Sequence, residues 1–544
     1  MITTYSLNHF GIVASACKEL NIAEIIDTLI PHDPQQKVTT GQAAVAMIIN
    51  GLGFSNRPLY LFPQFFEKKP VELLIGKEIT SYSLNDDTVG RALDRLFNYG
   101  CTELFSSIAY IVAKSADVGK KFGHLDTTTF SVHGKYESSD NEDAAIHITY
   151  GKSKLRRPDL KQIFLNLLVS SDGGVPLFMQ TLNGNSSDTT IFRKTVTEFR
   201  RGLKENLQEI TYWIADSKLY TDKTLREMKD YLLWISRVPD NIMDAKNIIE
   251  KTATSLNELH SLDGENGYSY RRHESTYGGV NQRWLVVHSE QAEKRAIDTI
   301  ERAVNKELEK LQKKAKKLHR KKFYCEPDAR NSLSSLQRDM KYHTICIDEI
   351  VQKEKYNARG RPSKTKKKEK IITYFPRTRI TRTEEVIGLE IKKKAIFIIA
   401  TNELSEKKLT DQEVFDSYKG QQTVERGFRF LKDPLFFASS LFLKKPERIV
   451  ALTMVMCLTL LVYSICERKL RMALKEQEQS IVNQVGKPTQ RPTLRWIFQL
   501  FEDVHLVKIE DNNEVKYEVK NLRPDGIMAL NILGEEYMAH YLLA

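Results

Sequence analysis

The sequence predicts an α/β protein in which a helical N-terminal region precedes a mixed-sheet core. The first observation is that strand and helix patterns follow one another in the order βββαβαβ after residue 118. The second is the composition: 41% of the 544 residues are hydrophobic, 28% are charged, and there are only 16 Pro and 26 Gly. This composition excludes collagen-like, low-complexity and wholly disordered chains, and the length allows several domains.

The N-terminal region has apolar residues at helical spacing. The pattern runs from Phe10 to about Ala116, with apolar residues recurring every three to four positions. Thr40 and Asp86 stand where N-caps are expected. We therefore predict a helical N-terminal domain.

The core begins at Phe122, where the segment HLDTTTFSVHG alternates and is rich in β-formers. Two further strand-like runs, Gln162–Ser170 and Val175–Thr181, are joined by Ser171–Gly174, which is a turn sequence. The three runs predict a meander. The elements expected after it are a helix at Thr189–Leu203, a strand at Ile210–Ala215, a helix at Thr221–Tyr231 and a strand at Leu232–Arg237.

Beyond Pro239 the pattern becomes irregular and indicates an inserted domain. It contains two short strands and a long charged helix, followed by a return to strand and helix patterns. The predicted elements are strands at Tyr268–Glu274, Arg283–His288 and Ala395–Thr401, and helices at about Gln291–Lys322 and Thr410–Leu431, the last with Asp411 near its cap.

The segment Ile449–Cys466 has no charged residue over 18 positions, which reaches the lower limit for a membrane-spanning helix. A buried core helix is favoured, because Thr453 and Thr459 dilute the apolarity and no second span follows. Residues 1–30 lack the features of a signal peptide. We expect no membrane association.

Cysteine usage and charge limit the environment and the partner. The six cysteines form no CxxC pair, which is typical of a reducing cytosol and excludes a disulfide framework or a structural zinc site. The net charge of +12 favours a polyanionic partner. Nine basic residues against two acidic ones lie between Lys353 and Lys370.

Three acids are candidates for phosphodiester chemistry. Asp126 lies in the first core strand, Asp216 ends the fourth, and Glu425 lies within a helix rich in Arg and Lys. If the two strands are neighbours, the carboxylates meet at one edge of the sheet. Carboxylate oxygens suit hard divalent cations, and two such metals can activate a nucleophile and stabilise a leaving oxygen.

The segments HLDTTTF, IADSKLY and Tyr418–Lys432 resemble the three catalytic motifs of bacterial insertion-sequence transposases of the DDE group. In the branch concerned, the last motif is Tyr, two residues, Arg, three residues, Glu, six residues, Lys. Tyr418, Glu425 and Lys432 fall on this spacing, whereas Gln421 stands where Arg is expected. The stretch Tyr150–Asp188 is also similar to the second and third strands of these enzymes.

The resemblance implies a ribonuclease H-like mixed-sheet core with a β-rich insertion domain that helps to hold the DNA end. The 209 positions between Asp216 and Glu425 leave room for that insertion. The expected domains are a helical N-terminal domain that binds DNA ends (1–118), the first part of the core (119–240), the insertion (241–390), the second part of the core (391–475) and a C-terminal segment (476–544).

By the same resemblance, the function is metal-dependent cleavage at terminal inverted repeats and strand transfer into target DNA. The acids Asp126, Asp216 and Glu425 would bind two Mg²⁺ ions, with Mn²⁺ as a substitute. The expected partner is double-stranded DNA, bound by a homodimer in the bacterial cytoplasm at the nucleoid. Expected DNA contacts are Tyr418, Gln421, Arg426, Arg429, Lys432, Arg359 and Arg361.

Several alternatives stay open at this stage. The chain could be a ribonuclease H-like nuclease or an inactive, transposase-derived DNA-binding protein. Arg359–Pro362 resembles an AT-hook but equally fits a solvated basic loop. His124 and His133 flank the first acid, where a structural role is favoured over a catalytic base. No GxSxG or GxxxxGK[ST] motif occurs, so no nucleotide cofactor is implied.

Overall fold

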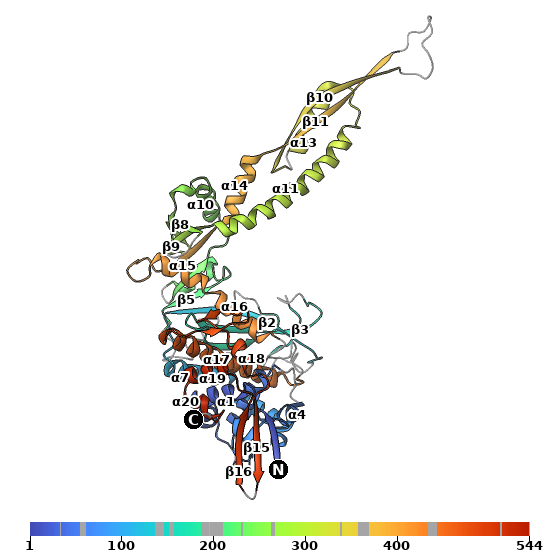
Figure 1. The fold of residues 1–544 in the computed structure, drawn as a ribbon. Helices are drawn as coiled ribbons and strands as arrows, with labels where there is room; N and C mark the ends of the chain where they lie inside the picture. The colour runs from blue at the N-terminus through green and yellow to red at the C-terminus, as the bar shows by residue number, and fades with distance from the viewer. Residues whose placement is uncertain are drawn as a thin grey trace. The chain divides into compact units, whose positions relative to one another are not determined.

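The computed structural model divides the chain into two compact units (Figure 1). The first unit comprises Met1–Ser236, Tyr277–Val280 and Glu413–Ala544, and the second comprises Arg237–Thr276 and Asn281–Gln412. The structure describes all residues except 33, 55–60, 137–145, 152–156, 187–194, 196–209, 230–231, 263–266, 338–339, 357–368, 434–442, 512–513 and 543–544.

The core of the first unit is a mixed sheet with the strand order β4-β3-β2-β5-β6. β3 pairs antiparallel with both β2 and β4, whereas β2, β5 and β6 are parallel to one another. The strands are β2 (Phe122–Val132), β3 (Lys161–Ser170), β4 (Pro176–Leu182), β5 (Tyr212–Ala215) and β6 (Leu233–Arg237), with α9 (Asp222–Met228) between the last two. All of these elements confirm the sequence prediction, whereas the helix expected at 189–203 lies outside the described residues apart from Thr195.

Helices of the N-terminal region precede the sheet, as predicted. The α-helices are α1 (Phe10–Glu19), α2 (Ile22–Leu29), α3 (Thr40–Gly51), α4 (Phe62–Phe66), α5 (Val71–Leu74), α6 (Asp86–Tyr99) and α7 (Cys101–Ser115), and a 3-10 turn, η2, covers Ser81–Leu84. The predicted caps were one residue too late. Thr39 caps α3 in a reciprocal capping box with Gln42, and the Asn85 side chain accepts from the amide of Thr88 at the start of α6.

The helix α17 (Pro446–Glu476) is the central helix of the first unit. It packs against α3, α6, α7 and β4, and most of its apolar residues are buried, among them Leu458 and Leu461. Among the described helices it is the one long and apolar enough to cross a membrane, and 83% of its most apolar stretch is buried inside the protein. This packing agrees with the core-helix interpretation of the sequence.

The two ends of the chain meet in a small sheet that the sequence did not predict. β1 (Ile2–Ser6) pairs antiparallel with β15 (His505–Asp511), which pairs in turn with β16 (Glu514–Lys520). The other C-terminal elements are β13 (Ile481–Val482), β14 (Pro488–Thr489), α18 (Leu494–Leu500), α19 (Pro524–Leu533) and α20 (Glu535–Ala539). Since α20 also contacts α1, the termini help to close the first unit.

The second unit combines strands with a 29-residue helix, α11 (Glu290–Leu318). Four strands lie in the order β12-β9-β8-β7, and β10 and β11 form a long antiparallel hairpin. The strands are β7 (His260–Ser261), β8 (Tyr268–Tyr277), β9 (Val280–Ser289), β10 (His343–Tyr356), β11 (Lys370–Arg382) and β12 (Ile396–Thr401). The other helices are α10 (Met243–Thr254), a short 3-10 turn η4 (Leu256–Glu258), α12 (Glu326–Asn331), α13 (Ser334–Gln337) and α14 (Glu384–Ala395).

One face of α11 holds the second unit together. Its buried residues recur at helical spacing. Ile300 and Val304 pack with Ile387 of α14, and Ala315 and Leu318 belong to a cluster with residues of the β10–β11 hairpin. Figure 1 shows α11 running from β9 past α14 and alongside the β10–β11 hairpin.

One predicted helix proved to be two. The continuous helix expected over Thr410–Leu431 is α15 (Asp411–Lys419) followed by α16 (Gln422–Leu431). The break falls at Gly420–Gln421, where the amide of Thr423 already bonds to the carbonyl of Gly420.

The burial of α17 makes a stability prediction. Leu458→Ala removes a fully buried side chain from the centre of the first unit and should lower the free energy of unfolding by about 2–5 kcal/mol. Met472→Ala, on the same helix but 41% exposed, is the matched control and should cost well under half as much in urea denaturation. Equal effects would show that the middle of α17 is not in a packed core.

Candidate active site

The parallel pairing of β2 and β5 brings the first two candidate acids together. Phe122 pairs with Tyr212 and His124 pairs with Ile214, so paired residues are 90 positions apart in the sequence. Asp126 and Asp216 are separated by the same 90 positions, so they stand at the same level of neighbouring strands, which lie about 4.8 Å apart. Both side chains line one small pocket.

Local hydrogen bonds orient the two acids. The amide of Thr127 donates to Asp126 Oδ1 at 2.7 Å. The amide of Lys218 donates to Asp216 Oδ1 at 3.0 Å, and the ammonium of Lys218 lies 3.7 Å from Asp216 Oδ2. The hydroxyl of Ser236 donates to the carbonyl of Asp216 at 3.0 Å. Ser236 on β6 therefore holds the backbone at the end of β5 in place.

Asn166 is a further polar group in this pocket that the sequence analysis missed. It lies on β3 directly opposite Thr127, is fully buried and lines the pocket with both acids. Its Nδ2 donates to Thr195 at 2.6 Å, whereas its Oδ1 has no hydrogen-bond partner in the part of the chain that the structure describes. A signal was present in the sequence, because Asn166 interrupts the apolar run IFLNLLV.

The carboxylate oxygens of this pocket fit a hard divalent cation. Two carboxylates line a single pocket, and Mg²⁺ and Mn²⁺ prefer such ligands. Asn166 pairs with Thr127, so its side chain points to the opposite face of the sheet from Asp126. Lys218, the one cation in the lining, stands on the Asp216 side. A bound cation would replace this lysine as the main counter-charge of the pair.

Glu425 does not lie among the residues that line this pocket. It is exposed on α16, and no group of three His, Cys, Asp or Glu residues that could hold a metal occurs among the described residues. However, α16 packs against β2 and β3. Its role as third ligand stays a prediction.

Lys432 ties the end of α16 to the strand of the first acid. Its ammonium donates to the hydroxyl of Thr128, two positions after Asp126, and stands 5.7 Å from the ring centroid of Phe130. Two of the three segments singled out in the sequence therefore meet through their side chains. The third segment, around Asp216, lies next to the first because β5 pairs with β2.

The remaining residues expected to contact DNA have different surroundings. Tyr418 is half-buried on α15, and Gln421 is half-buried at the N-cap of α16. Arg426 and Arg429 are exposed, and Arg426 donates to the Thr423 hydroxyl at 3.3 Å. Arg359 and Arg361 lie outside the described residues.

His124 lies close to Gly420, between α15 and α16, and leaves little room for a side chain at that position. A Cβ built at Gly420 would stand 3.2 Å from His124 Cε1 and 3.0 Å from the Ser417 carbonyl. His124 is fully buried, and burial lowers its pKa to about 4. It is therefore neutral at pH 7 and acts as a packing surface for the junction that precedes Glu425. His133, by contrast, is exposed.

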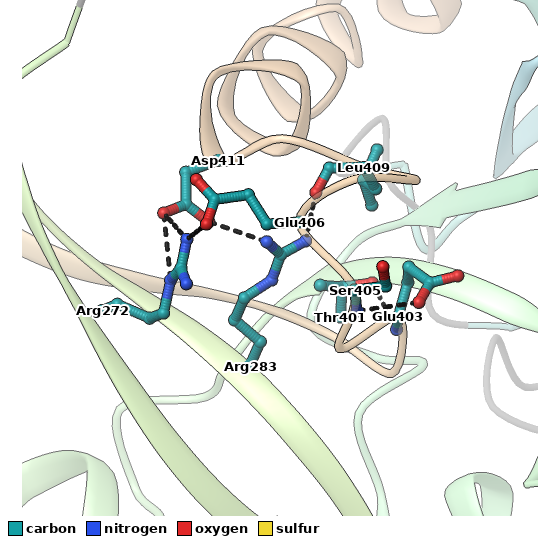
Figure 2. Close-up of polar contacts among 8 residues, drawn as sticks. All are labelled: Arg272, Arg283, Thr401, Glu403, Ser405, Glu406, Leu409 and Asp411. Atoms are coloured by element: carbon teal, nitrogen blue, oxygen red, sulfur yellow. Dashed lines mark hydrogen bonds and ion pairs between the residues drawn. The ribbon is translucent and has the colours of Figure 1, made fainter.

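A charged cluster in the second unit anchors the segment that leads into α15 (Figure 2). Arg283 is 2% exposed, and its guanidinium donates to Asp411 Oδ1 at 3.0 Å and to the Leu409 carbonyl at 2.6 Å. Arg272 donates to Asp411 Oδ2 at 2.7 Å and pairs with Glu406 at 2.9 Å. The hydrogen bonds that Arg272 donates to the carboxylates of Glu406 and Asp411 raise its pKa, and burial lowers the pKa of Arg283.

The same segment is braced upstream by its own side chains. The amide of Glu403 donates to the Thr401 hydroxyl at 3.2 Å, and the amide of Ser405 donates to Glu403 at 2.9 Å. Figure 2 shows these bonds in the turn that ends at Leu409 and Asp411. Since Asp411 is the first residue of α15, the two arginines fix where this helix begins.

Two parts of the chain match known protein families. The family described as "Transposase DDE domain" matches residues 119–462, and a domain of unknown function, DUF4277, matches residues 2–110. The first match spans both acids, Glu425 and the second unit, and it confirms the predicted α/β, ribonuclease H-like fold class. No curated protein matches.

One similar solved structure is the cryo-EM structure of a piggyBac transposase synaptic complex with hairpin DNA. It is 8% identical, and the alignment covers 90% of this chain and 77% of that one, with a TM-score of 0.35.

The buried charge of Arg283 makes a stability prediction for the second unit. Asp411→Asn keeps the shape of the side chain but removes the carboxylate, which leaves Arg283 buried without its counter-charge. The free energy of unfolding should fall by about 3 kcal/mol, measured by urea denaturation. Glu406→Gln, at the exposed edge of the cluster, should leave the midpoint close to that of the parent protein. The account of the cluster fails if both variants behave alike.

The contact between His124 and Gly420 predicts energetic coupling. Gly420→Val should cost about 1–3 kcal/mol because the added methyl groups meet a fixed ring. His124→Ala in the same chain should recover part of that loss. A double-mutant cycle in urea tests this, and strictly additive effects would exclude the contact.

Proposed function

Because this chain belongs to the family of transposases with a DDE domain, we propose that it moves an insertion sequence. In this proposal it cuts DNA at the inverted repeats that end the element and joins the freed 3′ hydroxyls to target DNA. The observation that carries the proposal is the pocket shared by Asp126 and Asp216. It offers the hard oxygen ligands that this chemistry needs, in a chain whose family match includes both acids.

Asp126, Asp216 and Glu425 are the proposed ligands of two Mg²⁺ ions, with Mn²⁺ as a substitute. When bound, such a pair of ions activates the attacking water or 3′ hydroxyl and stabilises the leaving oxygen. Lys218 orients Asp216.

The basic residues of the last motif are proposed to hold the DNA backbone near the scissile bond. Tyr418 and Lys432 position phosphates there. Arg426 and Arg429 are exposed on α16, and either can supply the guanidinium that Gln421 lacks, since arginine's planar fork suits phosphate. Phosphate contacts of this kind fix the register of the DNA without reading its sequence.

The biological setting follows from the same proposal. Two element ends must be brought together before strand transfer, which favours a homodimer assembled on double-stranded DNA. The N-terminal region that matches DUF4277 is the proposed reader of the terminal repeats. The site of action is the bacterial cytoplasm, at the nucleoid.

A nuclease on the same core is the second candidate function. Both would cut a labelled duplex that carries one element end. Only a transposase produces molecules in which the end is covalently joined to a second, unlabelled duplex, and these run as longer products on a denaturing gel. Cleavage without such products would favour the nuclease.

Removal of single carboxylates tests the assignment of the acids. Asp126→Asn, Asp216→Asn and Glu425→Gln should each lower cleavage of an element end by about 10³-fold or more, because each takes a ligand from the metals. Binding of the same DNA in a mobility-shift assay should remain. EDTA should abolish the activity of the parent protein, and Mg²⁺ or Mn²⁺ should restore it.

The matched control is Asp222→Asn. Asp222 is an exposed carboxylate that pairs with Arg226 on α9 and does not line the pocket. This variant should cleave at the parental rate. Full activity in any of the three site variants would remove that residue from the metal site, and full activity in all three would overturn the proposed mechanism.

A further inference from the structure

The net positive charge of the protein resides in the second unit. This unit contains 38 Lys and Arg against 26 Asp and Glu, an excess of 12. The first unit contains 44 of each. The excess therefore equals the +12 of the whole chain, and a polyanion is attracted to the second unit above all.

Part of this charge surrounds a hollow of about 780 Å³ within the second unit. We call it the α10–α11–α14 hollow, since residues of these three helices form most of its lining. Its base is apolar and includes Ile249, Ala296 and Ile396. Its rim carries six cations: Arg237, Lys246, Arg295, Lys341, Lys393 and Lys394.

Three acids also line the hollow, and each of them forms an ion pair with a neighbouring cation. Lys393 pairs with Glu250 and stands 3.6 Å from Glu390. Lys341 pairs with Glu390 at 2.6 Å. The third acid, Asp240, lies 3.7 Å from Arg237.

The other three cations have no acidic partner in the hollow. Lys246 of α10 and Lys394 of α14 form no side-chain hydrogen bond or ion pair with the residues that the structure describes. Arg295 of α11 bonds through Nε to the Gln291 carbonyl at 3.2 Å, which leaves its two terminal NH₂ groups to face a ligand. All three side chains are exposed.

We propose that the α10–α11–α14 hollow is a binding site for the phosphate backbone of double-stranded DNA, with Lys246, Arg295 and Lys394 as its phosphate ligands. The three cations come from three different helices and converge on one concave surface. The neighbouring ion pairs connect residues of the lining but leave the charges of these three cations unneutralised. Duplex DNA carries one negative charge per about 1.7 Å of its axis, so several cations can engage successive phosphates at once.

This inference rests on the proposed function, since it names a surface that holds the DNA on which the carboxylates act. It assigns no sequence preference, because backbone contacts position DNA without reading bases. The hollow is distinct from the pocket of Asp126 and Asp216, which no residue of the second unit lines.

The test compares two triple variants of the full chain. The hollow triple is Lys246→Ala, Arg295→Ala and Lys394→Ala. The flank triple is Lys251→Ala, Lys294→Ala and Lys392→Ala, which removes one exposed lysine from each of the same helices outside the lining. Both change the net charge equally. If DNA is held only by diffuse electrostatic attraction, the two triples should weaken DNA binding equally. If the hollow is a specific site, the hollow triple should weaken binding more.

The measurement is binding of a fluorescein-labelled, mixed-sequence DNA duplex between about 50 and 200 mM NaCl. The hollow triple should bind at least tenfold more weakly at the low-salt end. Its slope of log Kd against log salt should be flatter by about 2.7, since each lost phosphate contact removes about 0.9. The flank triple should stay close to the parent in both quantities.

Further variants and controls make each outcome decisive. A charge-conserving triple, Lys246→Arg, Arg295→Lys and Lys394→Arg, should retain most of the binding, and all variants should unfold at the parental temperature. Equal loss in the hollow and flank triples, or no loss in either, overturns the proposal. If polyglutamate binds the parent but not the hollow triple, while the DNA duplex binds both equally, the hollow is assigned to an acidic protein partner instead.

Cleavage by the parent protein separates this proposal from the proposed function. If the parent cuts element ends while the hollow triple binds DNA normally, only the inference about the hollow fails. If the parent never cuts although the hollow triple alone loses binding, the transposase mechanism fails and the DNA-binding site stands.

Discussion

The parallel register between β2 and β5 is the constraint on which the candidate site depends. It aligns two carboxylates that are 90 positions apart in the sequence, Asp126 and Asp216, at one level of the sheet. A slip of one residue would turn one of them to the opposite face. The register is secured by buried apolar side chains such as Leu125 and Ile214 and by the bond from Ser236 to the backbone of Asp216. The position of the acids is thus a consequence of core packing.

The approach of α16 to this pair depends on contacts that lie far apart in the chain. Lys432 is bonded to Thr128 on β2, and Gly420 allows the junction before α16 to lie against the ring of His124. Upstream, Arg283 and its partners fix the start of α15 at Asp411 (Figure 2).

Much of the fold could be predicted from the sequence, because the strands of the core are short apolar or alternating runs and α17 is a long apolar run. Contacts between distant segments could not. The pairing of β1 with β15 joins residues some 500 positions apart, and the close approach of His124 to Gly420 joins residues some 300 positions apart. In the site, strand placement and resemblance to the family's motifs predicted Asp126 and Asp216, whereas the buried Asn166 was found only through the pairing of β3 with β2.

The central claim is that the pocket between β2 and β5 binds divalent metal, and it can be tested directly. Crystals of the full chain soaked in Mn²⁺ should show anomalous scattering peaks within coordination distance, about 2.0–2.3 Å, of the carboxylates of Asp126 and Asp216, with Glu425 completing the site. The peaks should vanish in Asp126→Asn. Saturating Mn²⁺ with no peak at either aspartate, or with peaks only elsewhere, would contradict the account.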